Sequence, residues 1–280
     1  MLKQYKPTLD KLTKIVGKSH VLIDEQDTRH YRQGIRFGEG KVLAVVCPGT
    51  LLEQWQALQT IIEADCVVIM QAANTGLTGG STPYGDDYDR PVIIMSTRRL
   101  QGIQVILDGK QVVCLPGATL DNLERTLKPY NREPHSVIGS SCIGASVLGG
   151  VCNNSGGALV RRGPAYTEMA LYARVNESGE LELINHLGID LGNTAEEILT
   201  RLQKQDYETS QITTQTTQLA SDNRYAHDVK QVDADSPARF NADPTRLYEA
   251  SGSAGKVCVF AVRLDTFEKV ESKVFYIGSN

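Results

Sequence analysis

The most informative segment of the chain is CVVIMQAANTGLTGGSTP, residues 66–83. Residues 66–70 form an apolar run rich in valine and isoleucine, which predicts a short buried strand. The thirteen residues that follow, 71–83, carry no charge and include three glycines and an asparagine. Backbone N–H groups in such a loop can surround an anion, because few side chains stand in the way. The stretch therefore predicts a strand that ends in a phosphate-binding loop.

The residue types in this loop also favour unusual backbone angles. Gly76, Gly79 and Gly80 tolerate a positive φ, which costs a residue with a Cβ roughly 1–2 kcal/mol. An asparagine tolerates that conformation better than most other residues. The alternative is an ordinary surface turn, since these residue types crowd any loop, but such a turn accounts poorly for thirteen uncharged residues. Small hydroxyl donors are contributed by Thr75, Thr78, Ser81 and Thr82.

Two common phosphate motifs do not fit. A dinucleotide-binding G-x-G-x-x-G sequence opens directly into a helix, whereas here the glycines fall as G-x-x-G-G and a charged segment follows Pro83. The second candidate is SGSAGKV, residues 251–257, which has the Gly-Lys pair of a P-loop. Its glycines are too closely spaced, and Val257 stands where a Mg²⁺-binding Ser or Thr is needed. Both motifs are therefore rejected.

Composition limits the class of protein. The 280 residues are 41% hydrophobic and carry a formal charge of −4, which predicts a soluble globular protein with one large core or two small ones and gives no reason to expect nucleic acid. No apolar run approaches the roughly 20 residues of a membrane span, and no leader sequence opens the chain, so a cytosolic location is expected. The six cysteines contain no C-x-x-C pair, which favours reduced thiols over disulfides or zinc.

The first half of the chain predicts a β-α-β unit that ends at the phosphate loop. Thr8 is expected to cap a first helix that Gly17 ends. A buried strand at 43–47 is followed by a Pro-Gly turn and a capping box at 50–53, which begins a second helix. The apolar face of that helix is predicted to carry Leu52, Trp55, Leu58 and Ile62.

Alternating patterns and turn residues predict further strands along the chain. A strand at 91–95 precedes a hairpin of 103–107 and 111–115 around an Asp-Gly turn, and a helix follows Pro116-Gly117. Residues 169–175 and 181–185 form a second hairpin, and Thr194 with Glu197 caps a helix to about residue 202. Residues 203–243 are read as a long surface excursion. The last strands expected are 257–264, apolar on both faces and therefore central, and 274–277.

A second tract of small residues occupies 138–163, IGSSCIGASVLGGVCNNSGGALVRRG. It contains seven glycines, six of which lie among serines and asparagines, so this backbone can lie close to a planar ligand and offer it N–H and amide donors. A tightly packed helix crossing would also use small residues at this spacing. Two such tracts in one domain favour the ligand over the crossing.

Taken together, the phrases QAANTGLTGG and GSSCIGASVLGGVCNNSGG resemble the flavoprotein family of vanillyl-alcohol oxidase and p-cresol methylhydroxylase. Within it, the chain is similar from about residue 43 to its end to the quinone-linked, respiratory D-lactate dehydrogenases of bacteria, through PHSVIGSSCIGAS, GPAYTEM, NHLGIDLG, NADP and FAVRLDTFE. The resemblance implies an α+β fold of two α/β subdomains that binds FAD. It implies an FAD-binding domain at 1–265, with its core at about 39–210, and the start of a cap or substrate domain at 266–280.

The resemblance also implies which residues meet the cofactor. In the family the first loop holds the FAD pyrophosphate and ribityl region, and the second tract and the Val259 backbone line the flavin and adenine ends. Neither histidine nor cysteine occurs in 71–83, so non-covalent FAD is expected. The residues implied are Ala72, Ala73, Asn74, Thr75, Gly76, Gly80, Ser81, Gly139, Ser146, Gly156 and Val259.

The activity implied is oxidation of D-lactate to pyruvate, with electrons passed to membrane quinone. In that family a cap and a basic membrane-docking segment follow, so the chain is expected to be an N-terminal part, inactive alone and itself soluble. The complete enzyme is expected as a peripheral protein on the cytoplasmic side of the bacterial inner membrane; the sequence sets no oligomeric state. Alternatives are another flavoenzyme of this fold, acting on a different hydroxyacid or as an NADPH-dependent enolpyruvyl reductase, or a flavin-binding module without turnover.

The sequence identifies no catalytic acid or base. His135 precedes the second tract, but a lone histidine is more often structural than catalytic. Arg161 and Arg162 could bind a carboxylate or phosphate, although adjacent arginines point in different directions. The groups that bind lactate are expected beyond Asn280.

Overall fold

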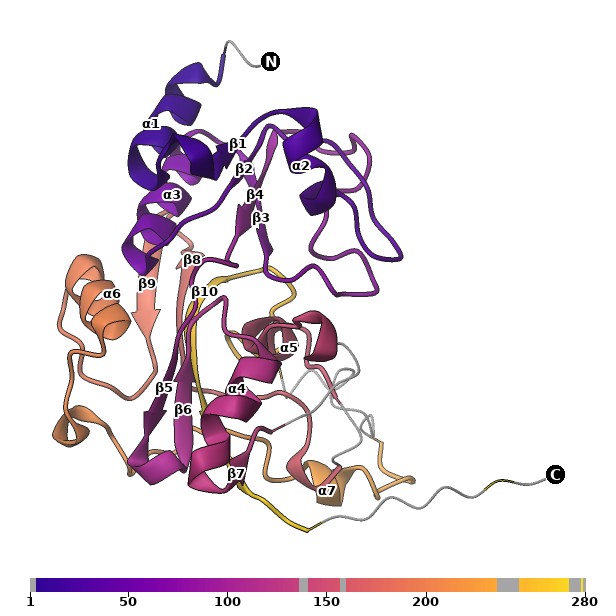
Figure 1. Cartoon of the computed structure of the whole chain (residues 1–280), viewed down its shortest axis with the longest axis vertical. Helices are drawn as coiled ribbons and strands as arrows, with labels where there is room; N and C mark the ends of the chain where they lie inside the picture. The colour runs from indigo at the N-terminus through magenta and orange to yellow at the C-terminus, as the bar shows by residue number, and fades with distance from the viewer. Residues whose placement is uncertain (1–3, 136–140, 157–159, 236–246, 272–277, 279–280) are drawn as a thin grey trace.

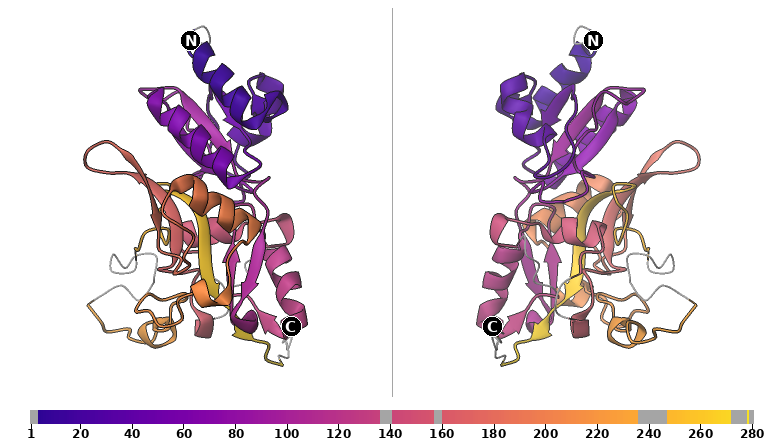
Figure 2. Two further views of the ribbon diagram at one scale, coloured as in Figure 1. Left: turned by 90° about the vertical axis from the view of Figure 1, so that its left-hand side faces the viewer. Right: turned by 90° about the vertical axis from the view of Figure 1, so that its right-hand side faces the viewer.

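The computed structural model describes residues 4–135, 141–156, 160–235, 247–271 and 278. The chain forms two α/β lobes, each built on its own sheet, with the N-terminal lobe above the second in Figure 1. The expected strand at 274–277 and the candidate Gly139 lie outside the described residues. Figure 2 shows the two lobes from the sides, with the hairpin of the second sheet projecting beyond its helices.

The N-terminal lobe is organised around a mainly parallel sheet of order β1-β2-β4-β3. Strands β2 and β3 both run parallel to β4, which lies between them, and β1 is antiparallel to β2. The predicted β-α-β unit is therefore confirmed. The elements of this lobe are α1 (Lys6–Val16), β1 (Val21–Leu22), α2 (Glu25–Arg32), β2 (Ala44–Val46), α3 (Leu51–Glu63), β3 (Val67–Gln71) and β4 (Val92–Ser96).

The second lobe contains an antiparallel sheet of order β5-β6-β10-β8-β9. The predicted central strand is confirmed, since β10 pairs with β6 on one side and β8 on the other. The elements here are β5 (Ile103–Ile106), β6 (Gln111–Cys114), α4 (Leu120–Leu127), β7 (Arg132–Glu133), α5 (Val147–Cys152), β8 (Ala170–Val175), β9 (Leu181–Asn185), α6 (Ala195–Lys204), α7 (Tyr225–Asp228), β10 (Cys258–Asp265) and β11 (Phe267–Glu268). Short 3-10 turns lie at Lys18–His20, Leu107–Gly109, Lys128–Tyr130, Ser141–Ile143, Val160–Arg162 and Thr209–Gln211.

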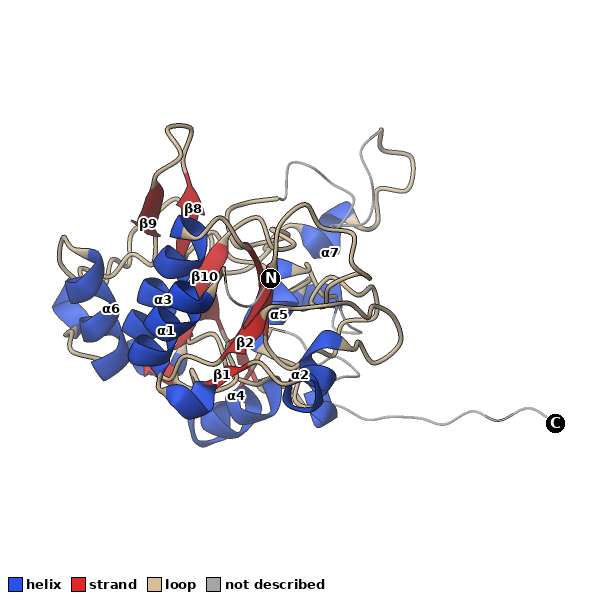
Figure 3. Cartoon of the chain, turned by 90° about the horizontal axis from the view of Figure 1, so that it is seen from above, coloured by secondary structure: helices blue, strands red, loops and turns tan. Residues whose placement is uncertain are grey.

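One apolar core joins the two lobes. It contains α1 and α3, which lie side by side in Figure 3, together with buried residues of β6, β8, β10 and α6. Trp55 of α3 meets Phe260 of β10 edge-on, with ring centroids 6.2 Å apart. A second cluster lies between the other face of the second sheet and helices α4 and α5. Because α3 packs against β10, the two lobes share side chains across their boundary.

Three local predictions are wrong: the start of the first helix, the residues that α3 buries, and the burial of β3. Helix α1 begins at Lys6, with Pro7 in its first turn, so Thr8 lies inside the helix and does not cap it. The buried face of α3 carries Leu51 and Ile61 where Leu52 and Ile62 were expected, because both lobes cover this helix and shift its apolar face. Strand β3 is half-buried rather than buried, since it is the edge strand of its sheet.

The hairpin turns also differ in detail. The β5–β6 turn spans the four residues 107–110, not two, and Leu107, Asp108 and Gly109 all have positive φ. The second hairpin forms around Gly179 as predicted. Thr50 and Thr194 cap α3 and α6 through their hydroxyl groups, as the sequence predicts.

Candidate functional site

The loop after β3 offers a row of backbone N–H donors with no acceptor among the described residues. Among the described residues, none of the N–H groups of residues 72–81 donates a hydrogen bond to a protein acceptor. Residues 72–75 are half-buried and 76–78 are exposed, so these donors lie at an accessible surface. Figure 1 shows the loop descending from β3 toward the level of α5. Free N–H groups on an uncharged loop are suited to an anionic group such as a pyrophosphate.

The glycines of this loop divide into two kinds. A Cβ added at Gly76 or Gly80 would have no other atom within 4 Å, so both positions border open space. At Gly79 φ is +76°, and a Cβ would lie 2.9 Å from the Phe37 ring. Asn74, with φ of 55°, is the other left-handed residue of the loop. Of the three glycines that can tolerate a positive φ, Gly79 adopts one and Gly76 and Gly80 do not, so a ligand's close approach is the remaining reason for glycine at those two positions.

Side chains at the base hold the loop in shape. The Asn74 side-chain amide donates to the Gln33 carbonyl at 2.8 Å, and its oxygen accepts from the Ser81 hydroxyl at 2.9 Å. The Thr82 hydroxyl donates to the Gly79 carbonyl at 3.1 Å. Asn74 and Ser81, both predicted cofactor residues, thus contact each other across the loop.

The second tract contributes a short helix and an exposed turn. Ser146 is buried and caps α5, accepting from the Gly149 N–H at 3.0 Å. Gly156 is exposed, and a Cβ added there would have no atom within 4 Å. Ser146 therefore fixes the start of α5, while Gly156 leaves an open backbone position like those of the first loop.

The two tracts are connected through one intervening segment. The Thr97 N–H donates to the Gln71 carbonyl at 2.8 Å, and the Thr97 hydroxyl donates to the Pro116 carbonyl at 3.2 Å. Two residues further on, the Ala118 carbonyl accepts from the Val147 N–H at 2.9 Å. Hydrogen bonds therefore connect both the base of the first loop and the start of α5 to the same stretch, residues 116–118.

Val259 lies where the central strand is irregular. The pairing of β10 with β8 shifts register between Val259 and Ala261, and β6 pairs with β10 only from Val262 onward. The Val259 carbonyl instead accepts from the Gln54 side-chain amide at 3.2 Å. Because of this interruption, some backbone groups of β10 take no part in strand pairing. Such groups remain able to contact a ligand.

The geometry fits a dinucleotide flavin. Its pyrophosphate needs several donors without bulky side chains, which residues 72–81 provide, and its ring system needs flat, small-residue backbone, which Gly156 provides. The residues that would hold the pyrophosphate are those of the first loop. The described part of the second tract, around Ser146 and Gly156, would lie against the remainder of the cofactor.

His135 and its neighbours form a structural cluster. The His135 side chain is 2% exposed, and burial and the Arg162 charge lower its pKa from 6.5 to about 4. Arg162 donates to the Glu133 carboxylate at 2.5 Å and to the Pro134 carbonyl at 2.9 Å, and its guanidinium lies 5.2 Å from the Phe267 ring centre. A neutral buried imidazole and a paired arginine favour the structural interpretation over the catalytic one. Arg161, its neighbour, is exposed.

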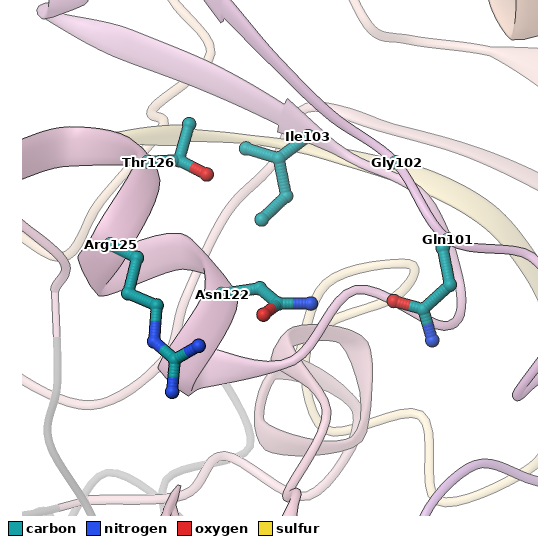
Figure 4. Close-up of a pocket in the computed structure, with 6 residues that line it drawn as sticks. All are labelled: Gln101, Gly102, Ile103, Asn122, Arg125 and Thr126. Carbon is teal, nitrogen blue, oxygen red and sulfur yellow. The ribbon is translucent and has the colours of Figure 1, made fainter.

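A surface pocket lies apart from the predicted cofactor residues. Figure 4 shows a surface pocket between α4 and the start of β5; none of its lining residues is a predicted cofactor residue. The described residues contain no group of three side chains able to hold a metal ion. Within the same residues, no helix combines the length and apolar character needed to cross a membrane. The pocket is lined by Gln101, Gly102, Ile103, Asn122, Arg125 and Thr126.

Comparison with known proteins identifies the domain. The FAD binding domain family matches residues 42–182, half of the chain. The chain belongs to this family. FAD is therefore its cofactor, and the sequence-based expectation of an FAD-binding fold is confirmed.

Relatives of this family member are similar over nearly its whole length. The quinone-dependent D-lactate dehydrogenase of Haemophilus influenzae is 62% identical over 273 residues, covering 97% of this chain and 48% of the relative. That of Escherichia coli is 58% identical over 276 residues, covering 98% of this chain and 48% of the relative. The chain spans about half the length of the curated relatives it matches, and the resemblance drawn from the sequence is confirmed.

Solved structures support the fold. A p-cresol methylhydroxylase with substrate bound aligns with a TM-score of 0.58 at 13% identity, covering 95% of this chain and 44% of the other. An alkyldihydroxyacetonephosphate synthase aligns with a TM-score of 0.61 at 12% identity, covering 94% and 40%. At these identities the likeness concerns the fold alone, and it confirms the p-cresol methylhydroxylase type predicted from the sequence.

Sequence reasoning missed the residues that connect the parts of the site. Gln54 was read as an ordinary position of a helix and Gln71 as the first residue of the loop, yet both are buried and donate to backbone carbonyls far away in the chain. No role was predicted for residues 31–33, although the carbonyls of Tyr31 and Gln33 accept from the side-chain amides of Gln71 and Asn74. A buried glutamine in an apolar run was the one available signal, since a buried amide needs a partner.

Proposed function

We propose that this chain is the FAD-binding part of a quinone-dependent D-lactate dehydrogenase. The observation that carries the proposal is 62% identity across 97% of the chain to a protein of that name. The free N–H groups of residues 72–81 add support, since they suit the pyrophosphate of the cofactor that such an enzyme uses. The division into a cofactor domain at 1–265 and the start of a cap at 266–280 stays part of the proposal.

The chain's own residues would act by binding and orientation. Backbone N–H groups of 72–76, 80 and 81 would donate to the pyrophosphate, and Gly80 would let it approach without a side chain in the way. Gly139, Ser146, Gly156 and the Val259 backbone would contact the flavin and adenine ends. No covalent attachment is proposed, because 71–83 contains neither cysteine nor histidine.

The overall reaction would convert D-lactate and quinone into pyruvate and quinol. D-lactate loses two electrons and two protons, from its hydroxyl group and its α-carbon, and quinone gains the same number. Bound FAD supplies a carrier that accepts and passes on two electrons. The fixed loop backbone would keep that carrier in one orientation. Positioning of this kind lowers the barrier of a reaction.

Quinone as acceptor places the proposed enzyme at a membrane surface. Respiratory quinones are apolar and reside in the bilayer, so a protein that reduces them must reach it. We therefore include in the proposal a peripheral location on the cytoplasmic side of the bacterial inner membrane. D-lactate, quinone and that membrane are the partners proposed for the complete enzyme.

An absorbance spectrum tests the cofactor and a substrate titration tests the reaction. The 280-residue chain, incubated with FAD and freed of excess, should show protein-bound flavin absorbance. The protein expressed from its intact gene should then lose that absorbance under nitrogen on addition of D-lactate and regain it with a soluble quinone. L-lactate and NADPH are the controls. Bleaching by NADPH and not by D-lactate would overturn the proposed activity.

A further inference from the structure

The side chain of Gln71 ties the two ends of the phosphate loop together. Gln71 is the last residue of β3, and it is 2% exposed. Its side-chain nitrogen donates to the Ser81 carbonyl at 2.6 Å and to the Tyr31 carbonyl at 2.7 Å. Both hydrogens of the amide are thus used, one across ten residues of the loop and one toward an earlier segment.

The loop depends on such contacts because it has no regular secondary structure. Residues 72–82 contain no helix or strand, and the free N–H groups of 72–81 contribute no bonds to its closure. Its shape is held by side-chain bonds from Gln71, Asn74, Ser81 and Thr82. Of these four side chains, Gln71 is the most deeply buried, and it spans the loop at its base. Its bonds are therefore the best shielded from competition by water.

The second acceptor comes from the segment 20–41, which we call the N-terminal strap. This strap precedes the region that matches the FAD binding domain family. It accepts from Gln71 at Tyr31 and from Asn74 at Gln33. Just beyond the far end of the loop, the Gly85 N–H donates to the Glu39 carbonyl of the strap at 2.7 Å. The strap therefore contacts the beginning of the loop and the residues just beyond its end.

The strap is itself fixed to the sheet. The Cys47 N–H donates to the His20 carbonyl at 2.9 Å, and β1 pairs with β2. Figure 1 shows α2 of the strap to the right of the upper part of this sheet. A carbonyl held in this way provides a stationary acceptor for the glutamine.

We propose that Gln71 is a positioning residue for FAD, which orients the loop N–H groups by clamping Ser81 against the strap. This inference rests on the proposed cofactor role of the loop. Gln71 would not touch the cofactor. It would reduce the entropy that the loop loses on binding, so that free N–H groups are already aligned. The competing interpretation is that Gln71 stabilises the N-terminal lobe and has no effect on the ligand beyond that.

Gln71→Met tests the proposal, because methionine keeps the volume and removes both donors. A matched control is Gln104→Met in the second lobe, since Gln104 is also buried and donates to a backbone carbonyl, that of Leu202, at 2.6 Å. Each variant is checked by circular dichroism and thermal unfolding, and its FAD dissociation constant is measured by quenching of flavin fluorescence. Gln71→Met should weaken FAD binding at least tenfold, whereas Gln104→Met should leave it within twofold at a similar loss of stability.

A second variant and a second readout keep the test decisive. Gln71→Glu keeps the shape of the side chain but replaces its amide with a carboxylate, which can only accept hydrogen bonds. The carboxylate would repel the carbonyl oxygens of Tyr31 and Ser81, so this variant should weaken FAD binding more than Gln71→Met does. ¹⁵N relaxation of residues 72–81 should show faster backbone motion in both variants without ligand. Unchanged relaxation and an FAD affinity within twofold of wild type would overturn the proposal. Absence of FAD binding by the wild type would instead contradict the proposed function, and the relaxation data would still decide the role of Gln71.

Discussion

The side-chain amide of Gln54 donates to the Val259 carbonyl at 3.2 Å and so joins the two lobes at the irregular part of β10. Gln54 is fully buried on α3, and the same nitrogen lies 3.2 Å from the Cys258 sulfur. Within the part of the chain that the structure describes, its side-chain oxygen has no hydrogen-bond partner. A buried amide with one satisfied and one unsatisfied end contributes little net stability, so its position at Val259 needs another explanation.

We expect Gln54→Met to change stability little and FAD affinity clearly. The substitution removes the bond to Val259 but also removes the unsatisfied oxygen, and these effects offset each other to within about 1 kcal/mol. FAD binding should weaken about tenfold, because the Val259 backbone is no longer held. Denaturant unfolding and fluorescence titration measure the two quantities. Loss of stability by several kcal/mol with unchanged affinity would show that the bond is only structural.

Substitutions at neighbouring glycines should have opposite effects. Gly80→Val points into open space, so the fold should persist while FAD affinity falls by orders of magnitude. Gly79→Val should destabilise the fold, because its positive φ costs roughly 1–2 kcal/mol and its Cβ would meet the Phe37 ring. Thermal unfolding and FAD titration of both variants separate the cases. Tight FAD binding by Gly80→Val with a native circular dichroism spectrum would show that the loop does not cradle the cofactor.

Gly79 and Gly80 show which features of the site could be predicted from the sequence alone. The loop was predictable because its unusual composition is local, and the central position of β10 was predictable because its run is apolar on both faces. Which glycine is covered by protein and which borders open space depends on the strap packed against Gly79, and no local sequence pattern predicts that contact. The buried face of α3 was shifted for the same reason, since two lobes cover one helix.

The cysteines should differ sharply in reactivity. Burial raises the pKa of the Cys114 and Cys258 thiols to about 12, and it raises those of Cys47, Cys66 and Cys152 as well. Cys142 is the one exposed cysteine, and no disulfide involves any of the six. Because the thiolate is the reactive form, a disulfide reagent should modify one thiol rapidly in the native protein and six after denaturation. Rapid reaction of two or more thiols would contradict the burial of the others.

The flavin should separate from the protein on denaturation. Covalent attachment needs a nucleophilic side chain within reach of the ring, and residues 71–83 contain no histidine or cysteine. After acid precipitation of the FAD-loaded chain, the yellow colour should remain in the supernatant. Colour retained in the washed pellet would show a covalent bond and direct attention to Cys142 or Cys152 of the second tract.

Stability below neutral pH should depend on His135. Its folded-state pKa of about 4 lies below its usual 6.5, so the folded protein keeps the imidazole neutral while the unfolded chain can bind a proton. The contribution of neutral His135 to the free energy of unfolding is therefore fully present above pH 6.5 and is lost as the pH falls toward 4. The loss amounts to about 3 kcal/mol, since one pKa unit corresponds to about 1.4 kcal/mol.

His135→Leu should flatten this part of the pH profile. Leucine has a similar volume and cannot titrate, and it also removes a ring nitrogen that has no hydrogen-bond partner among the described residues. Urea unfolding at several pH values between 4 and 6.5 measures the slope, with His227→Leu on the exposed face of α7 as the control. The control should keep the wild-type slope. If His135→Leu keeps it too, the imidazole binds a proton in the folded protein as readily as in the unfolded chain, and burial does not lower its pKa.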